Sequence, residues 1–231
     1  MGPSGRTQQP PSRGSAASAL KQRIIADDGR SLAAKSRGRR WETLLGHFPD
    51  LRSMAVVDLG GTPEFWRWAP IRPRHVVCVN PFSRASDEDG DEPWLTTVRA
   101  DACCVSDIGT FDLAFSNSTI EHVGGHARRL DFARSVRTLS AHYWVQTPYR
   151  YFPVEPHFLF PCMQFLPTRQ QALIAERWPL SNCGVHRGTD AVNMVLWVDL
   201  LSITDMRHYF PDATMLRERV LGITKSIIAV R

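Results

Sequence analysis

The stretch Val56-Val57-Asp58-Leu59-Gly60-Gly61-Thr62-Pro63 decides the fold of this 231-residue chain. An apolar run that begins at Met54 predicts a buried parallel strand, and the paired glycines predict a tight turn at its end. Glycine permits the backbone angles of such a turn and lets a ligand approach closely. Asp58 can accept hydrogen bonds from a cationic amino group at this point. The alternative is a structural turn with a capping carboxylate.

The loop after this strand departs from the dinucleotide-binding pattern G-x-G-x-x-G. Gly61, Thr62 and Pro63 follow Gly60, so the spacing of the pattern is not met. The pattern lets the backbone approach a pyrophosphate, and without it we do not expect a pyrophosphate cradle. This argues against a nicotinamide-dependent reductase.

Strand and helix signals alternate outward from this loop. Short apolar runs predict further strands at 75–80, 96–100, 111–118 and 141–148, and an antiparallel hairpin over 213–231. Helices are expected at 31–48, where Ser31 can act as the cap, at 127–139 and within 202–211. The alternation favours a doubly wound, Rossmann-like α/β sheet that is mostly parallel, with a C-terminal antiparallel β-hairpin.

The composition is that of an ordinary packed protein, with 43% hydrophobic residues and a net charge of +5. Residues 1–20 are polar and of low complexity, so we expect a disordered tail, with one domain over 21–231. No apolar run approaches about 18 residues, and no membrane span is expected. Five cysteines without repeated C-x-x-C spacing fit reduced thiols in a cytoplasmic protein.

Two polar residues follow neighbouring predicted strands. Asn80 lies where nucleotide-binding sheets place the group that contacts the ribose hydroxyls. Its amide can pair with a diol, although a turn residue before Pro81 is the alternative. Asp101 follows the next strand and can accept a hydrogen bond from the exocyclic amine of an adenine. Its alternative role is that of a cap or loop carboxylate.

The fourth predicted strand leads into the segment 111–123, FDLAFSNSTIEHV. Together with Asp58-x-Gly60-Gly61, Asn80 and Ala100-Asp101-Ala102, this segment resembles the class I methyltransferases that use S-adenosylmethionine (SAM). More narrowly, it is similar to the methyltransferase type 11 group. The resemblance covers about residues 40–231.

The resemblance implies a single SAM-binding methyltransferase domain over 21–231, with a lid-like insert around 150–201. The implied cofactor contacts are Asp58, Gly60 and Gly61 with the methionine end, Asn80 with the ribose, Asp101 and Ala102 with the adenine, and Ser116 and Asn117 beside the sulfonium. Two positions depart from the family pattern. Thr62-Pro63 replaces a further glycine, and Asn80 replaces an acid.

Glu121 and His122 are adjacent, and His126 follows four residues after His122, which could place metal ligands on one helical face. Some small-RNA 2′-O-methyltransferases and quinone-pathway O-methyltransferases look similar, with Glu-x-x-Glu-His. Here Ser118 stands where the first Glu would be, so one carboxylate ligand is missing. We therefore expect no metal site, and interpret the pair as a helix start that orients the loop under the cofactor.

Residues 144–161, WVQTPYRYFPVEPHFLFP, follow the fifth predicted strand. Their aromatic residues and prolines at the carboxyl edge of a sheet predict the wall of an acceptor pocket, with Gln146 and Tyr149 as substrate contacts. His157 is the predicted general base, because its ordinary pKa lies near neutrality. Glu155 is expected to orient it or to take the proton itself. The alternative is a structural loop in which His157 bonds to the backbone.

These patterns favour SAM-dependent methyl transfer to a small or medium acceptor, with O-methylation as the expected reaction. A nucleic-acid methyltransferase is one alternative. The basic residues lie mostly in the N-terminal tail, however, and the core has no evident Lys/Arg stripe. The other alternative is a noncatalytic binding or scaffold protein of the same fold, which the substitutions at Thr62-Pro63 and Asn80 would suit.

Overall fold

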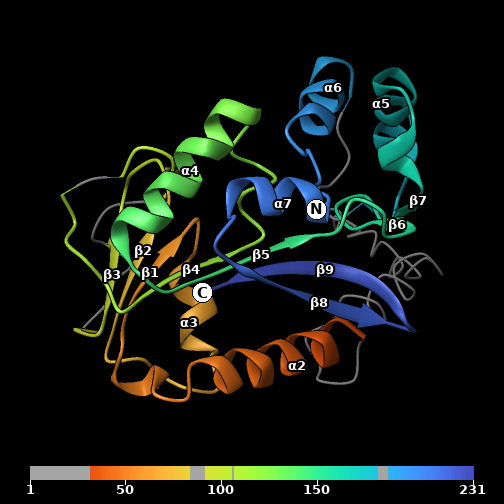
Figure 1. Ribbon diagram of the computed structural model, residues 1–231. Coiled ribbons are helices and arrows are strands. Elements are labelled where there is room, and N and C mark those ends of the chain that lie inside the picture. Colours follow the sequence, from red (N-terminus) through yellow and green to blue (C-terminus); the bar gives the residue numbers. More distant parts are fainter. Residues whose placement is uncertain (1–31, 84–91, 106, 182–186) are drawn as a thin grey trace, which may run out of the picture.

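A computed structural model describes residues 32–83, 92–105, 107–181 and 187–231 and contains a seven-stranded sheet in the order β3-β2-β1-β4-β5-β9-β8 (Figure 1). The strands are β1 (Ala55–Leu59), β2 (His75–Val79), β3 (Leu95–Val98), β4 (Leu113–Asn117), β5 (Tyr143–Pro148), β8 (Thr214–Val220) and β9 (Ile223–Val230). The first five are parallel, and β9 is antiparallel to β5 and β8. The predicted fold class is confirmed.

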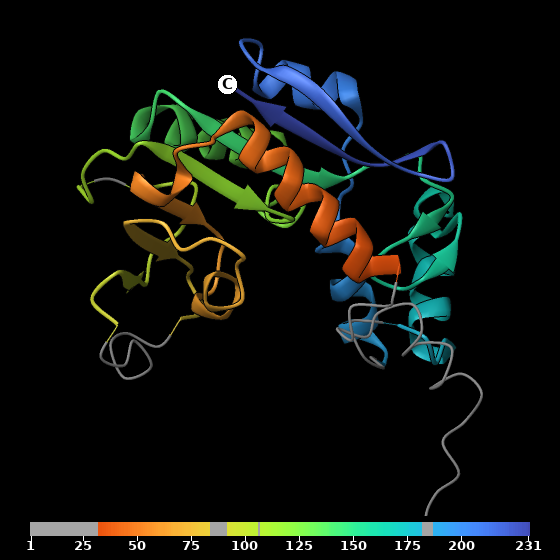
Figure 2. The ribbon, with the colours of Figure 1, turned by 90° about the horizontal axis from the view of Figure 1, so that it is seen from below.

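Helices cover both faces of the sheet. Successive side chains of a strand point to opposite faces, and in β1 both sets include apolar residues that must be buried. On one face, Val56 of β1 packs with the residues of α2 (Leu32–His47) and α3 (Pro63–Arg67). On the other, Val57 packs with α4 (His126–Leu139) and α7 (Ile203–Tyr209). Figures 1 and 2 show α2 running across its face toward the end of the sheet where the insert lies. Both faces of the parallel strands are therefore buried.

The observed elements follow the predicted ones closely. The helix expected at 127–139 spans His126–Leu139, and the strand expected at 96–100 spans Leu95–Val98. The predicted cap Ser31 and the tail over 1–20 lie outside the described residues. No helix in the described ranges is long and apolar enough to cross a bilayer.

The structure explains why Thr62-Pro63 departs from the glycine pattern. Pro63 is the first residue of α3, a position that proline favours because its φ is already helical and its missing N–H would have no partner there. The helix places Trp66 beneath β1, where the indole is buried against Phe65 and Phe115. The departure thus shortens the glycine loop and starts a helix.

An insert projects from the carboxyl end of β5. It carries the short strands β6 (Val154–Glu155) and β7 (Phe160–Pro161), the 3-10 helix Met163–Phe165, and the helices α5 (Thr168–Arg177) and α6 (Thr189–Leu196). These helices pack on one another through a small core of their own (Figure 1). The insert leaves and rejoins the sheet at one place, because Tyr149 bridges to Leu201 and Arg150 N–H donates to the Leu201 carbonyl.

The helix expected within 202–211 has a complete capping box, in which Ser202 and Asp205 each bond to the backbone N–H of the other. We expect Ser202→Ala to lower the free energy of unfolding by about 1 kcal/mol, because the first turn of α7 loses its acceptor. Urea unfolding followed by circular dichroism measures this. An unchanged midpoint would show that water replaces the hydroxyl at no cost.

Candidate active site

A cavity of about 480 Å³ opens at the carboxyl ends of β1, β2 and β4, and we call it the edge cavity. It lies where the strand order reverses between β1 and β4, the place where open α/β sheets bind ligands. The residues that line it are Gly60, Asn80, Pro81, Phe82, Asp101, Ala102, Ser118, Thr119, His122, Val123, Arg128 and Trp197. Four of the predicted cofactor residues are among them: Gly60, Asn80, Asp101 and Ala102.

The floor of the edge cavity is a glycine turn without room for side chains. Gly60 has a φ of +89°, and a Cβ there would lie 2.3 Å from Thr119. A Cβ on Gly61 would lie 1.9 Å from an Asp58 oxygen. The Asn80 amide donates to the carbonyls of both glycines, and its oxygen accepts from the Phe82 N–H. Asn80 therefore holds the turn in shape, which a carboxylate cannot do because it has no donor.

Asp101 lies at the far side of the edge cavity. Its carboxylate accepts hydrogen bonds from the Cys103 N–H and from Arg128. Burial alone would raise the pKa of Asp101, but these donors and the Arg128 charge outweigh it, so the pKa is lowered. The group is ionised at neutral pH and can accept a further hydrogen bond from a ligand amine.

Asp58 points away from the edge cavity. Its position in β1 shares a face with Val56, so the carboxylate lies beneath the sheet, where the Trp66 indole donates to it at 2.8 Å. It is 1% exposed, and burial raises its pKa to about 7 despite that hydrogen bond. Contact with a methionine amino group thus needs water or a movement of this side chain.

Gly61, Ser116 and Asn117 likewise do not line the edge cavity. The Ser116 hydroxyl donates to the Leu59 carbonyl, which ties β4 to β1. Asn117 accepts a hydrogen bond from Arg40 of α2, on the other side of the sheet edge. The next residue, Ser118, does line the cavity, with a φ of 57° that few L residues adopt. The turn after β4 thus presents Ser118 and Thr119 in place of the two predicted residues.

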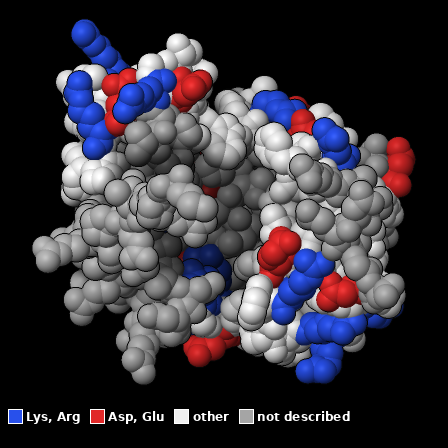
Figure 3. Space-filling model, turned by 180° about the vertical axis from the view of Figure 1, so that it is seen from behind, with Lys and Arg blue, Asp and Glu red and all other residues white. Residues whose placement is uncertain are grey.

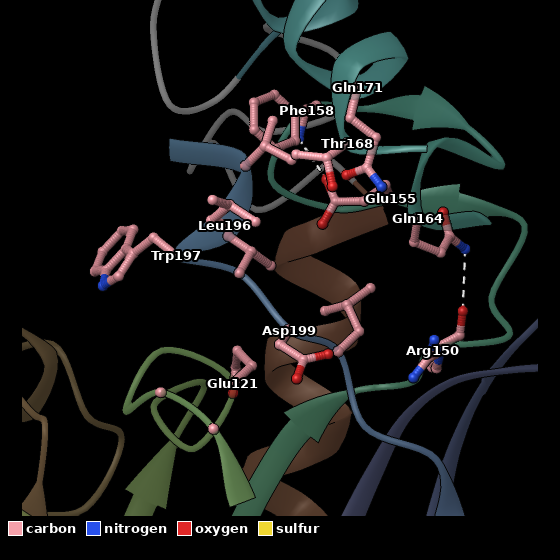
Figure 4. Close-up of a pocket in the computed structure, with 15 residues that line it drawn as sticks. Glu121, Arg150, Glu155, Phe158, Gln164, Thr168, Gln171, Leu196, Trp197 and Asp199 are labelled. Carbon is pink, nitrogen blue, oxygen red and sulfur yellow. Dashed lines mark hydrogen bonds between the residues drawn. The ribbon is translucent and has the colours of Figure 1, made fainter. Parts of the chain in front are cut away.

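A second cavity of about 410 Å³, the insert cavity, lies between the sheet edge and the insert. Figure 4 shows Glu121, on the loop after β4, on the opposite side of it from Glu155, Thr168 and Gln171. Arg150, Gln164 and Asp199 also line it, and the Arg150 guanidinium is exposed. Trp197, at the end of α6, lines both cavities. The two cavities are therefore neighbours across the Glu121-His122 peptide and Trp197.

The predicted pair Glu155 and His157 is held together at this junction. His157 Nδ1 donates to a Glu155 oxygen at 2.7 Å, and the other oxygen accepts from the Phe158 N–H. Burial by itself lowers the pKa of His157. The hydrogen bond to Glu155 and the charges of Glu155 and Glu121 outweigh burial, so the pKa is raised above its ordinary value. His157 Nε2 faces His122 Nε2 at 3.2 Å. This is an imidazole oriented by a carboxylate, an arrangement suited to accept a proton.

The predicted substrate contacts Gln146 and Tyr149 line neither cavity. Gln146 is 1% exposed within β5, and its oxygen accepts from the Ser118 hydroxyl. Tyr149 stacks edge to face with Tyr151 at the start of the insert. Gln146 lies inside β5 and Tyr149 directly follows this strand, before the insert begins, so neither reaches a cavity.

No family model matches the chain, and no curated protein matches it in sequence. Solved structures do share its fold. An S-adenosylmethionine-dependent methyltransferase from Mesorhizobium loti has a TM-score of 0.50 and 16% identity, over 83% of this chain and 97% of that one. A protein from Listeria monocytogenes named for the same activity has a TM-score of 0.50 and 11% identity, over 85% and 97%. A possible exported protein from Bordetella parapertussis has a TM-score of 0.51 and 15% identity, over 86% and 68%.

The chain has the class I methyltransferase fold. Several residues that the insert and the turns bring to the two cavities were not predicted from the sequence. Arg128, Phe82, Thr119 and Trp197 line the edge cavity, and no local sequence pattern marks any of them for it. Gln164, Thr168 and Gln171 of the insert cavity are ordinary polar residues of a helical stretch. Only the folding of the insert onto the sheet identifies them.

Asp58 predicts a measurable pH dependence of stability. Its pKa is about 7 in the folded chain against an ordinary 3.8. Between these values the folded state holds a proton that the unfolded state has lost, so the stability due to this group falls as pH rises. The slope is up to about 1.4 kcal/mol per pH unit. Asp58→Asn should reduce the loss of stability between about pH 5 and pH 7 in urea unfolding.

The matched control is Asp131→Asn on the exposed side of α4, where the side chain pairs with Arg134. The free energy of unfolding of this variant should depend on pH as it does in the unaltered chain. An equal slope in Asp58→Asn and the unaltered chain would show that Asp58 is ionised in the folded state.

Proposed function

We propose that this protein transfers the methyl group of SAM to a small or medium acceptor, with the cofactor in the edge cavity. The observation that carries the proposal is the set Gly60, Asn80 and Asp101 around one cavity at the reversal of strand order. The likeness in fold to SAM-dependent methyltransferases supports it. A volume of about 480 Å³ lies within the range of about 300–1,000 Å³ that ligand pockets occupy.

The acceptor is proposed to bind in the insert cavity, with its reacting oxygen near Glu121 and His157. Methyl transfer needs an acceptor lone pair in line with the methyl–sulfur bond, so holding both molecules accounts for much of the rate. His157 lines neither cavity, and its Nε2 takes the acceptor proton once His122 moves away from that nitrogen; Glu155 stabilises the imidazolium that forms. The raised pKa of His157 suits an acceptor hydroxyl, which favours O-methylation.

The insert cavity favours a small polar acceptor over a nucleic acid. Its lining combines Arg150, which can donate to a carboxylate or carbonyl group, with the Gln164 Oε1 atom, which has no partner among the described residues and can accept from a hydroxyl. On the face seen in Figure 3, acidic and basic side chains are interspersed on the described parts of the surface. A nucleic-acid groove would carry one sign of charge along its length.

We place the reaction in the cytoplasm, because Cys103, Cys104 and Cys162 are free thiols in the described part of the chain. We also propose that α5 and α6 act as a lid, since the insert closes the side of the cavity that faces away from the sheet. A lid of this kind would exclude water from the reacting groups.

The decisive experiment measures binding of SAM and of S-adenosylhomocysteine by calorimetry. We expect micromolar affinity for both ligands. In Asp101→Asn the affinity should fall by about tenfold or more, because an uncharged amide with one donor takes the place of an ionised carboxylate that only accepts. NADH should not bind. Asp131→Asn on the exposed face of α4 is the matched control and should bind as the unaltered chain does.

If neither adenosyl ligand binds, the proposal fails and the noncatalytic alternative takes its place. If both bind but Asp101→Asn binds equally well, the cofactor lies elsewhere on the sheet edge.

A second test addresses the proton. In a screen of small phenols and hydroxy acids that follows S-adenosylhomocysteine release, His157→Gln should lower turnover by about 100-fold or more. In the unaltered chain the rate should fall as the pH drops through an apparent pKa above 6.5, because the imidazole must be neutral to accept a proton. A pH profile that is identical in His157→Gln would remove His157 from this role.

A further inference from the structure

Three side chains with metal-ligating atoms meet between the edge cavity and the insert cavity. They are Glu121, His122 and His157, and one ligand atom of each lies within 4.8 Å of the other two. Glu121 and His122 come from the loop after β4, and His157 reaches them from the insert, 35 residues after His122. The sequence pattern pointed to His126 as their partner, but His126 lies against the Tyr209 hydroxyl instead.

The Glu121 carboxylate has one oxygen that the protein leaves unsatisfied. The residue is fully buried, and Thr147 donates to its Oε2 at 2.9 Å. Oε1 has no hydrogen-bond partner among the described residues. A buried acceptor without a partner destabilises the folded state. A cation bound at Oε1 would remove that destabilisation.

The two imidazoles are arranged as metal ligands are. Because His157 Nδ1 is tied to Glu155, its Nε2 is the atom that faces His122 Nε2 at 3.2 Å. Ligand bonds of about 2.0–2.1 Å in a tetrahedral site place neighbouring ligand atoms about 3.3 Å apart. A carboxylate behind the far ring nitrogen is the usual support of a metal-bound histidine. One proton shared between the two rings would give a similar separation, so the two cases must be distinguished by experiment.

We propose that Glu121, His122 and His157 bind one divalent first-row transition ion of the Zn²⁺ or Co²⁺ kind. Two imidazoles and one carboxylate suit such ions, whereas Mg²⁺ and Ca²⁺ prefer oxygen ligands throughout. This departs from the expectation of no metal, because that expectation did not include His157. The site lies where both cavities meet, since Glu121 lines one and His122 the other.

This metal site extends the proposed function, and the catalytic role of the ion rests on that proposal. With the ion bound, His157 would be a ligand and would no longer take the acceptor proton; the ion would instead lower the pKa of an acceptor hydroxyl, which would lose its proton to water before the methyl transfer. Binding of the ion itself can be measured without any acceptor.

The experiment titrates Co²⁺, and separately Zn²⁺, into chelator-treated full-length protein. Equilibrium dialysis with metal analysis gives the stoichiometry and the affinity. The starting chain carries Cys104→Ser and Cys162→Ser, because these exposed thiols could bind the same ions. We expect one ion per chain, with excess Mg²⁺ unable to displace it. The affinity should fall by at least about tenfold in Glu121→Gln and His157→Asn, and by about tenfold in Glu155→Gln, which loses the outer carboxylate.

The matched control is His142→Asn, an exposed histidine at the opposite end of the sheet, which should bind as the starting chain does. Glu121→Gln preserves side-chain volume. If Glu121→Gln does not fold, His157→Asn tests the site independently. Equal binding in all variants, or no ion bound at all, overturns the metal site. SAM binding measured on the same samples keeps the two proposals apart. SAM bound without an ion leaves the proposed function standing, and an ion bound without SAM leaves the metal site standing.

Discussion

The close approach of the loop after β1 to the loop after β4 is the constraint on which the rest of the site depends. Gly60 adopts a left-handed backbone angle directly against Thr119, and Gly61 lies directly against the Asp58 carboxylate. Neither position has space for a Cβ. The contact brings together the ends of two strands at the reversal of strand order, and the edge cavity opens above it. A side chain at Gly60 would push the two strand ends apart and fill the floor of the cavity, and one at Gly61 would displace the Asp58 carboxylate.

The two departures from the family pattern both serve this contact. Pro63 ends the turn by starting α3, which brings Trp66 under β1 as a donor to Asp58. Asn80 uses its amide to hold the carbonyls of Gly60 and Gly61, a task that the usual acid could not perform. The departures therefore stabilise a tight version of the turn. They give the noncatalytic alternative less support than the residue types alone did.

The insert determines what lies beside the edge cavity. Its helices share a small core, and its two ends are joined at Tyr149 and Leu201, so it sits on the sheet edge as a unit. The Asp199 N–H donates to the Glu121 carbonyl, and Trp197 stacks on His122. These contacts position His157 and its carboxylate partner over the Glu121-His122 peptide. Chemistry at this point thus combines residues from the sheet and from the insert.

The sequence by itself determined the order of strands and helices, the glycine turn and the terminal hairpin, because each depends on local periodicity and on turn residues. It also predicted Asn80 and Asp101, which line the edge cavity, and the pair Glu155 and His157, which the structure holds together. Asp58 was expected to face the cofactor, but the alternation of β1 turns its carboxylate beneath the sheet, where Trp66 donates to it. Only the tertiary structure decided that His157 meets Glu121 and His122, and that Trp197 joins the two cavities. Contacts between residues far apart in the chain depend on how the insert packs, and no local pattern encodes that packing.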